Sequence, residues 1–123
     1  MITEDYVSFE VAKLLKEKGF NAPLCCIYDI DGLFVDDHAE FSNSTDAPGF
    51  ECVAPTLQMA MKWLREVYNL YINIFVTWRN KIPHYQWSID NLITQNTIYD
   101  TPCLEKYKEA CEAAIKYCLE NLI

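Results

Sequence analysis

The sequence predicts an α+β domain in which three helices pack on a mainly antiparallel sheet of four to five strands. Three observations predict this class. Residues 57–68 and 104–122 place apolar side chains at three- and four-residue steps, which is typical of amphipathic helices. Residues 70–78 alternate in the manner of a half-buried strand. The dipeptide Asp31-Gly32 lies between two apolar runs, which favours a β-hairpin.

The first helix is expected to run from Ser8 to Lys18. Ser8 is a residue type preferred at N-caps, because its hydroxyl accepts a hydrogen bond from a free backbone N–H. Gly19 follows the apolar stripe and is suited to end the helix in a left-handed conformation.

Two antiparallel strands are then expected at residues 24–30 and 33–35, joined by a type I′ turn at Asp31-Gly32. Residues 36–52 are rich in Asp, Asn, Ser, Pro and Gly, a composition that favours turns. We expect one long surface loop there.

The second helix is expected from Pro55, which suits a first helical turn, through Tyr68. A strand over residues 70–78 should follow, then a turn at residues 79–81. A second strand is expected around residues 85–89, with a turn at residues 90–91.

Residues 93–99 are a possible further strand, and Thr101-Pro102 should begin the last helix. The element order is therefore helix, two strands, helix, two or three strands, helix.

Composition limits the domain count and the kinds of partner. A length of 123 residues predicts a single domain over residues 1–123. The formal net charge of -8 disfavours nucleic acid and anionic membrane surfaces as partners. No apolar stretch is long enough to span a bilayer, and the first residues do not resemble a secretory signal. The six cysteines are therefore expected to be thiols in a cytoplasmic protein.

The segment from Cys26 to Asp37 contains the most specific candidate motif. Its apolar run ends in Asp29-Ile-Asp31-Gly32, which resembles the first motif of the haloacid dehalogenase-like phosphatases. The resemblance implies that Asp29 is a nucleophile, that Asp31 is a general acid or base, and that Mg²⁺ is bound. Thr77, at the end of a later strand, would be the phosphate-binding hydroxyl. The hairpin turn is the favoured interpretation, because a parallel doubly wound sheet and the later motifs are missing.

Three segments that cover all three expected helices carry a second resemblance. Residues 8–20, residues 54–56 together with 62–67, and residues 109–120 resemble a family of small uncharacterised bacterial proteins, found in gut anaerobes and in phages or prophages. This resemblance implies an accessory protein and brings no catalytic residues.

The leading hypothesis is therefore a cytoplasmic accessory or protein-interaction domain, without catalytic residues, metal or other cofactor. Aromatic side chains at Tyr71, Phe75, Tyr85 and Trp87 are expected mainly in the core. A sheet that is apolar on both faces would also suit a homo-oligomer formed through a sheet face or edge. The alternative hypothesis is the Mg²⁺-dependent phosphatase.

Overall fold

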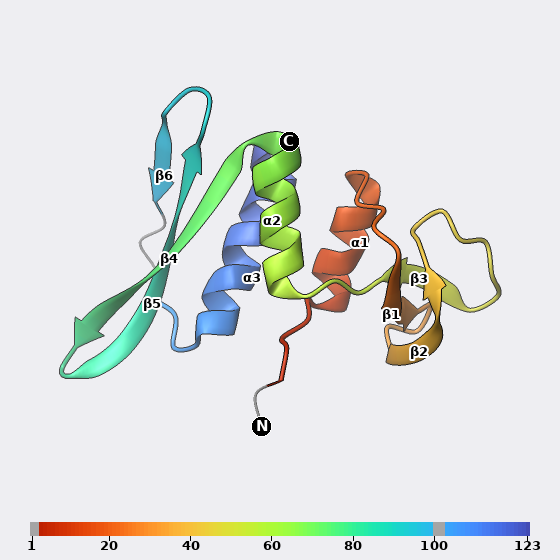
Figure 1. Cartoon of the computed structure of the whole chain (residues 1–123). Coiled ribbons are helices and arrows are strands. Elements are labelled where there is room, and N and C mark those ends of the chain that lie inside the picture. The colour runs from red at the N-terminus through yellow and green to blue at the C-terminus, as the bar shows by residue number, and fades with distance from the viewer. Residues whose placement is uncertain (1–2, 100–102) are drawn as a thin grey trace. The chain divides into compact units, whose positions relative to one another are not determined.

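The computed structural model describes residues 3–99 and 103–123. The chain divides into two compact units, Met1–Ala60 and Met61–Ile123, which are described separately. Their sheets are both antiparallel and three-stranded (Figure 1). The predicted α+β class is therefore confirmed, whereas the prediction of one sheet with four to five strands is wrong.

The first unit consists of one helix and one sheet, followed by the first turn of α2. Its elements are α1 (Phe9–Glu17), β1 (Leu24–Asp29), β2 (Phe34–Phe41) and β3 (Phe50–Val53). The strand order is β2-β1-β3, so β1 is central. Strand β2 extends the strand predicted at residues 33–35 into the segment predicted as a loop, and β3 begins inside that segment. The loop prediction is therefore wrong at both of its ends. The continuation of β2 was missed because this edge strand is mostly exposed and does not need an apolar pattern.

Helix α1 begins and ends as its sequence predicts. The side chain of Ser8 accepts a hydrogen bond from the backbone N–H of Val11 at 3.2 Å. At the other end, the N–H of Gly19 bonds to Lys16 and that of Phe20 bonds to Leu15. Gly19 has φ +99, so the helix ends in a Schellman motif. This end turns the chain toward β1.

The hairpin predicted at Asp31-Gly32 is present, but its turn type is different. Tyr28 pairs with Phe34, and the N–H of Gly32 bonds to the carbonyl of Asp29. Only Gly32 has a positive φ in this turn, whereas a type I′ turn needs two such residues. The pattern is a type I turn followed by a left-handed glycine, as in three-residue hairpins with a glycine bulge.

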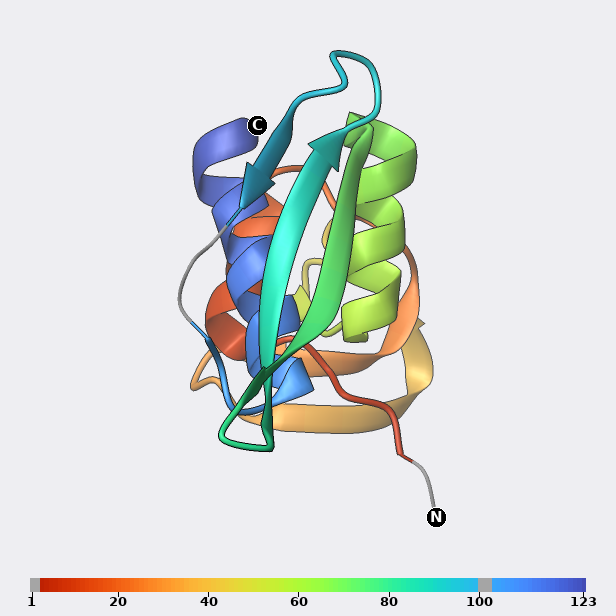
Figure 2. The same ribbon diagram turned by 90° about the vertical axis from the view of Figure 1, so that its left-hand side faces the viewer.

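The second unit contains most of α2 (Leu57–Tyr68) and all later elements. These are β4 (Leu70–Arg79), β5 (Ile82–Asn91), β6 (Thr97–Tyr99), α3 (Tyr107–Tyr117) and a π-helical turn, η1 (Cys118–Leu122). The strand order is β4-β5-β6. Helix α3 lies on one face of this sheet (Figure 2). Its buried residues are Ala110, Cys111, Ala114 and Ile115.

The last helix begins later than its sequence predicts. The expected start at Thr101-Pro102 lies outside the described residues, and α3 starts only at Tyr107. Leu104 forms an isolated antiparallel bridge with Tyr85 of β5. Their backbone bonds, at 2.7 and 2.9 Å, keep Leu104 extended and so delay the helix.

Candidate interaction surface

The end of the β4–β5 hairpin exposes an unusual amount of apolar side chain. We call residues 75–85 the hairpin tip. The exposed fractions are 36% for Phe75, 46% for Val76, 69% for Trp78 and 58% for Ile82. These are large side chains on adjacent positions of two paired strands. The tip is therefore a candidate binding surface.

The apolar side chains of the hairpin tip lie on both faces of the ribbon. Val76 and Trp78 share one face, because side chains alternate along a strand. Phe75 lies on the other face, together with Ile82, which pairs with Arg79. In an ordinary antiparallel sheet, one face is apolar and the other polar. The tip departs from this rule.

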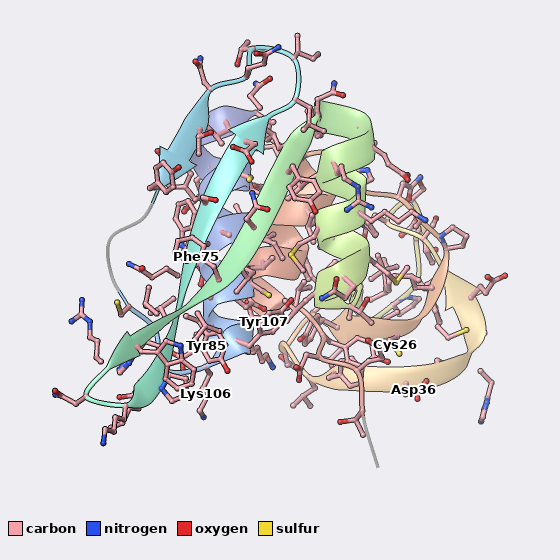
Figure 3. The ribbon with its side chains drawn as sticks, turned by 60° about the vertical axis from the view of Figure 1, so that its left-hand side comes forward. Cys26, Asp36, Phe75, Tyr85, Lys106 and Tyr107 are labelled. Atoms are coloured by element: carbon pink, nitrogen blue, oxygen red, sulfur yellow. The ribbon has the colours of Figure 1, made fainter. Side chains whose placement is uncertain are left out.

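The base of the tip is held against the segment that leads into α3. Tyr85 and Tyr107 contact each other edge to face, with ring centroids 6.0 Å apart (Figure 3). The Thr77 hydroxyl lies 3.7 Å from the Cys103 sulfur. Beyond these contacts the hairpin continues past the first turn of α3 (Figure 2). The contacts therefore give the tip a fixed base.

A two-residue turn closes the tip. Asn80 and Lys81 both have positive φ, at 50 and 65, and Arg79 pairs directly with Ile82. This is the backbone pattern of a type I′ turn, which matches the right-handed twist of the flanking strands. The turn predicted at residues 79–81 is confirmed, and it keeps the strands paired to their last residues.

The outer edge of β4 is long and almost without charge. Each of its ten residues pairs with β5, and within residues 3–99 and 103–123 no strand pairs with its other side. Arg79, at the end, is its single charged residue. Edge strands normally carry charges, bulges or prolines that prevent further pairing, or they are short. Apart from Arg79 at its end, the edge of β4 has none of these features.

Each remaining sheet edge has one of the usual protections. Strand β2 carries Asp36, Asp37 and Glu40, and its register with β1 is irregular between Leu24 and Cys26. Strands β3 and β6 are only 4 and 3 residues long. Among the described strands, β4 alone offers a long edge that is free of acidic residues.

The acidic residues of the phosphatase hypothesis lie in and beside the β1–β2 turn. An oxygen of the Asp29 carboxylate accepts hydrogen bonds from the backbone N–H groups of Asp31 and Leu33, both at 2.9 Å. The carboxylate of Asp29 therefore stabilises the turn. Thr77 belongs to the other unit, where it contacts Cys103.

Cys26 is a half-buried thiol of the first unit, and its surroundings favour the neutral form. Its sulfur lies 3.6 Å from the hydroxyl of Tyr6. Desolvation raises the pKa of Cys26, and the nearby charge of Asp36 raises it further, although the Tyr6 hydrogen bond opposes this. The pKa of Tyr6 is raised mainly by its hydrogen bond with Cys26. Cys26 is therefore a poor nucleophile at neutral pH.

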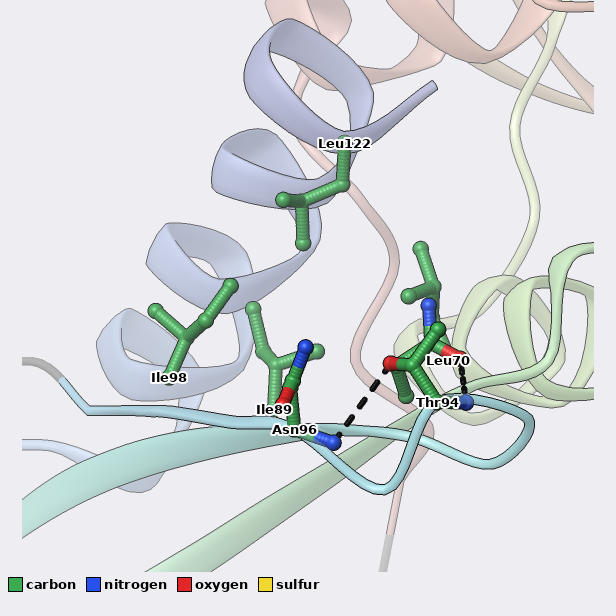
Figure 4. A pocket seen from close by; sticks show the side chains of 7 residues that line it. Leu70, Ile89, Thr94, Asn96, Ile98 and Leu122 are labelled. Atoms are coloured by element: carbon green, nitrogen blue, oxygen red, sulfur yellow. Dashed lines mark hydrogen bonds between the residues drawn. The ribbon is translucent and has the colours of Figure 1, made fainter.

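A small open cavity lies at the opposite end of the second sheet. It has a volume of about 270 Å³, and its walls are Leu70, Ile89, Asn91, Thr94, Asn96, Ile98 and Leu122 (Figure 4). The side chain of Asn91 accepts bonds from the N–H groups of Ile93 and Thr94 and so shapes the adjoining loop. No wall residue is charged, so the cavity offers no group for acid–base chemistry at neutral pH.

Residues 3–99 and 103–123 contain no cluster of three or more His, Cys, Asp or Glu side chains that is arranged to hold a metal ion. None of their helices is both long and apolar enough to cross a membrane.

Comparisons with protein-family models, curated proteins and solved structures gave no match to this chain. The resemblance to small bacterial and phage proteins therefore stays a prediction.

The sequence predicts the four aromatic residues mainly in the core. This is correct for Trp87, which is buried at 3% exposure, and wrong for Tyr71 and Phe75, which are exposed at 41% and 36%. Trp78 and Ile82 were not recognised. The sequence does contain a signal for this surface. Both faces of β4 carry large apolar residues, with Val76 and Trp78 on one face and Tyr71 and Phe75 on the other.

Proposed function

We propose that this chain is a cytoplasmic protein-interaction domain without catalytic activity, and that the hairpin tip is its binding surface. The observation that carries the proposal is the exposure of large apolar side chains on both faces of the tip. Isolated two-stranded hairpins are marginally stable in water. Such an exposed apolar ribbon gains most when a partner covers it.

The residue types at the tip support this proposal. Aromatic residues and Arg are enriched at protein–protein interfaces, and Trp is a frequent energetic hot spot. Trp78 and Arg79 are adjacent in β4, and both are exposed. A buried Trp contributes a large apolar area at a small cost in side-chain entropy.

The charge distribution also favours the tip over other surfaces. The chain has a formal net charge of -8, so two such chains, or this chain and another acidic protein, repel each other. The tip carries Arg79 and Lys81 and no acidic residue. Repulsion is therefore weakest where the exposed apolar side chains are found.

A location in the cytoplasm agrees with the state of the cysteines. All six are free thiols, and none forms a disulfide. Disulfides are rare in the reducing cytoplasm and common in exported proteins. The thiols therefore support the localisation part of the proposal.

Site-specific photocrosslinking tests the proposed surface. A benzophenone amino acid would replace Trp78 in one variant and Tyr99 in another, and each variant would be irradiated in cells that express it. Tyr99 is a matched control, because it is an aromatic strand residue with the same 69% exposure and lies in β6, outside the tip. Circular dichroism would verify that both variants are folded.

We expect discrete protein adducts from position 78 and none, or far fewer, from position 99. The adducts would be identified by mass spectrometry, whether they join two copies or a different protein. Equal adduct yields at both positions would overturn the proposal, since the tip would then be no more interactive than any exposed aromatic residue.

The phosphatase hypothesis stays a prediction, and no feature of the structure favours it over the interaction hypothesis. Hydrolysis of a generic phosphomonoester with Mg²⁺, compared between wild type and Asp29→Asn, tests it directly. Activity that is lost in the variant would show that the chain is an enzyme and would contradict the proposal of a non-catalytic domain.

A further inference from the structure

We infer that the partner at the hairpin tip is a second copy of this chain, joined by antiparallel pairing of the two β4 edges about Phe75. This inference rests on the proposed function and names its partner. Pairing between equivalent strands through a two-fold axis gives a closed dimer. The question is whether β4 is complementary to itself.

The face of β4 that carries Asn73, Phe75 and Thr77 is self-complementary in a register centred on Phe75. In that register Phe75 lies opposite Phe75 of the second copy, and Asn73 lies opposite Thr77 of the second copy. Aromatic pairs and hydrogen-bonding polar pairs are both favourable across antiparallel strands. Within β4, no residue lies opposite a residue of like charge in this register.

The other face of β4 is complementary in the same register. Ile74 lies opposite Val76 of the second copy, and Ile72 lies opposite Trp78 of the second copy. These are β-branched and aromatic pairs, which are among the most stabilising in sheets. Val76 and Trp78 are also among the most exposed apolar residues of the chain, at 46% and 69%, so pairing would cover them.

Neighbouring registers are poorer. Centring the pairs on Ile74 would place Asn73 opposite Phe75 and Tyr71 opposite Thr77. Centring them on Val76 would place Phe75 opposite Thr77 and Arg79 opposite Asn73. Each shift removes the Phe75–Phe75 pair and the Asn73–Thr77 pairs and puts apolar residues opposite polar ones or a charge opposite an amide. The residues on this face therefore favour the register centred on Phe75.

Arg65 limits the paired segment. Its guanidinium lies over the Tyr71 ring, 5.9 Å from the ring centre, near the beginning of β4. In the Phe75 register, Arg79 of the second copy would arrive at the same ring, where the two cations repel. Pairing should therefore extend over residues 72–78 and end there.

Backbone hydrogen bonds add to this complementarity. Pairing the two edges satisfies N–H and C=O groups of β4 that have no partner among the described strands, and it joins two three-stranded sheets into one. A sheet of that size is common. The same pairing through β2 would bring the acidic residues of two copies together, which disfavours that edge.

Sedimentation equilibrium of the purified chain over a wide concentration range tests the inference. The wild type should approach twice the chain mass of 14.3 kDa. Phe75→Lys places two like charges directly opposite each other at the two-fold axis and should weaken the dimer about 100-fold. Tyr99→Lys adds the same charge at an exposed position of β6 and should leave the dimer unchanged.

A disulfide trap tests the register and does not depend on the stability of the Lys variant. Residue 75 is the position that lies opposite itself, so Phe75→Cys chains should crosslink to each other under oxidised glutathione. Tyr99→Cys carries its added thiol at the 69% exposed control position. The wild type gives the level of crosslinking due to the six native thiols, and Tyr99→Cys chains should not exceed that level.

The two proposals fail in different ways. A wild type that stays monomeric, a dimer that is insensitive to Phe75→Lys, or equal crosslinking at positions 75 and 99 would each overturn the second-copy inference. If photocrosslinking from position 78 then captured a different protein, the proposed function would stand. If it captured none beyond the control, both proposals would fall.

Discussion

The two hairpins of this chain differ in how they limit further strand pairing. The β1–β2 hairpin has a glycine bulge in its turn, an irregular register and an acidic outer strand. The β4–β5 hairpin has a two-residue turn, an uninterrupted ladder and an outer strand whose single charge is at its end. The first hairpin has the features of a sheet that must stay monomeric, and the second lacks them.

This difference shows that apolar content alone does not mark an interaction surface. Phe34 and Val35 of β2 are exposed at 43% and 36%, values similar to that of Phe75 in β4. In β2, however, the acidic residues follow immediately. Apolar exposure without neighbouring charge, on a strand with a regular edge, is what distinguishes β4.

The largest effect on stability is expected at Gly32, which fixes the shape of the first hairpin. A Cβ atom at this position would lie 2.9 Å from Cδ2 of Phe9, and φ is +83. Gly32→Ala should therefore lower the free energy of unfolding by about 2–4 kcal/mol, through backbone strain and the clash with Phe9. Urea unfolding measures this change.

Gly49→Ala is the matched control for Gly32→Ala. Gly49 has φ +79, but a Cβ atom there would meet nothing within 4 Å. Its cost should be about 1 kcal/mol, from the backbone alone. Equal costs at the two positions would show that a Cβ atom at position 32 does not clash with Phe9.

Removing the charges of β2 should make the two hairpins more alike. The variant Asp36→Thr, Asp37→Thr and Glu40→Thr keeps β-forming residues and removes the acidic protection of this edge. Self-association should strengthen about tenfold relative to wild type, a change of about 1.4 kcal/mol. Light scattering measures it, and unchanged association would mean that the charges of β2 do not protect the edge.

A smaller effect is expected at the turn of the second hairpin. Lys81 has a left-handed backbone, with φ 65, in a type I′ turn for which Asn-Gly is the preferred sequence. Lys81→Gly should raise the free energy of unfolding by about 1 kcal/mol. A lower stability, measured by thermal unfolding, would show that the Lys81 side chain stabilises the folded hairpin.

Alkaline pH should lower the stability of both units, with no effect near neutrality. Burial is the main cause that raises the pKa of Cys52 to about 11 and that of Cys118 to about 12, from an ordinary value of 9.0. The folded chain holds these protons more tightly than the unfolded chain does. The stabilisation is therefore complete below pH 9 and is lost as pH rises through 11 and 12.

Cys52→Ala and Cys118→Ala test how much each thiol contributes to the loss of stability at alkaline pH, in the first and the second unit respectively. Each variant should show a flatter decline of the free energy of unfolding above pH 9 than wild type, whatever its stability at neutral pH. The decline removed by Cys118→Ala should extend to the higher pH. Parallel pH curves for a variant and wild type would contradict the proposed role of that thiol.

The helices and hairpins that the sequence predicted best are those with local signals. Ser8 and Gly19 bound α1 because they satisfy free backbone groups at each end. The extended start of the last segment was missed, because Leu104 is held by its bridge with Tyr85, a residue distant in sequence. Such tertiary contacts are not visible in local periodicity.

The division into two sheets and the position of the candidate surface were harder to predict. Alternating apolar residues predict a strand but do not specify its neighbours, so β1 and β4 looked like parts of one sheet. In the same way, the alternating pattern of β4 predicts an apolar set of residues on each face of the strand. It does not predict that Val76 and Trp78 are exposed, because this depends on where the contact between Tyr85 and Tyr107 ends the packed part of the hairpin. Exposure depends on where the packed helix begins.

Amide hydrogen exchange at two protein concentrations is the most direct test of the difference between β4 and β2. If the edge of β4 pairs with a second copy, its outward amides over residues 72–78 should exchange more slowly at the higher concentration, because new hydrogen bonds protect them. The edge amides of β2 should exchange at the same rate at both concentrations. Exchange in β4 that does not depend on concentration, in a hairpin that stays folded, would contradict the account.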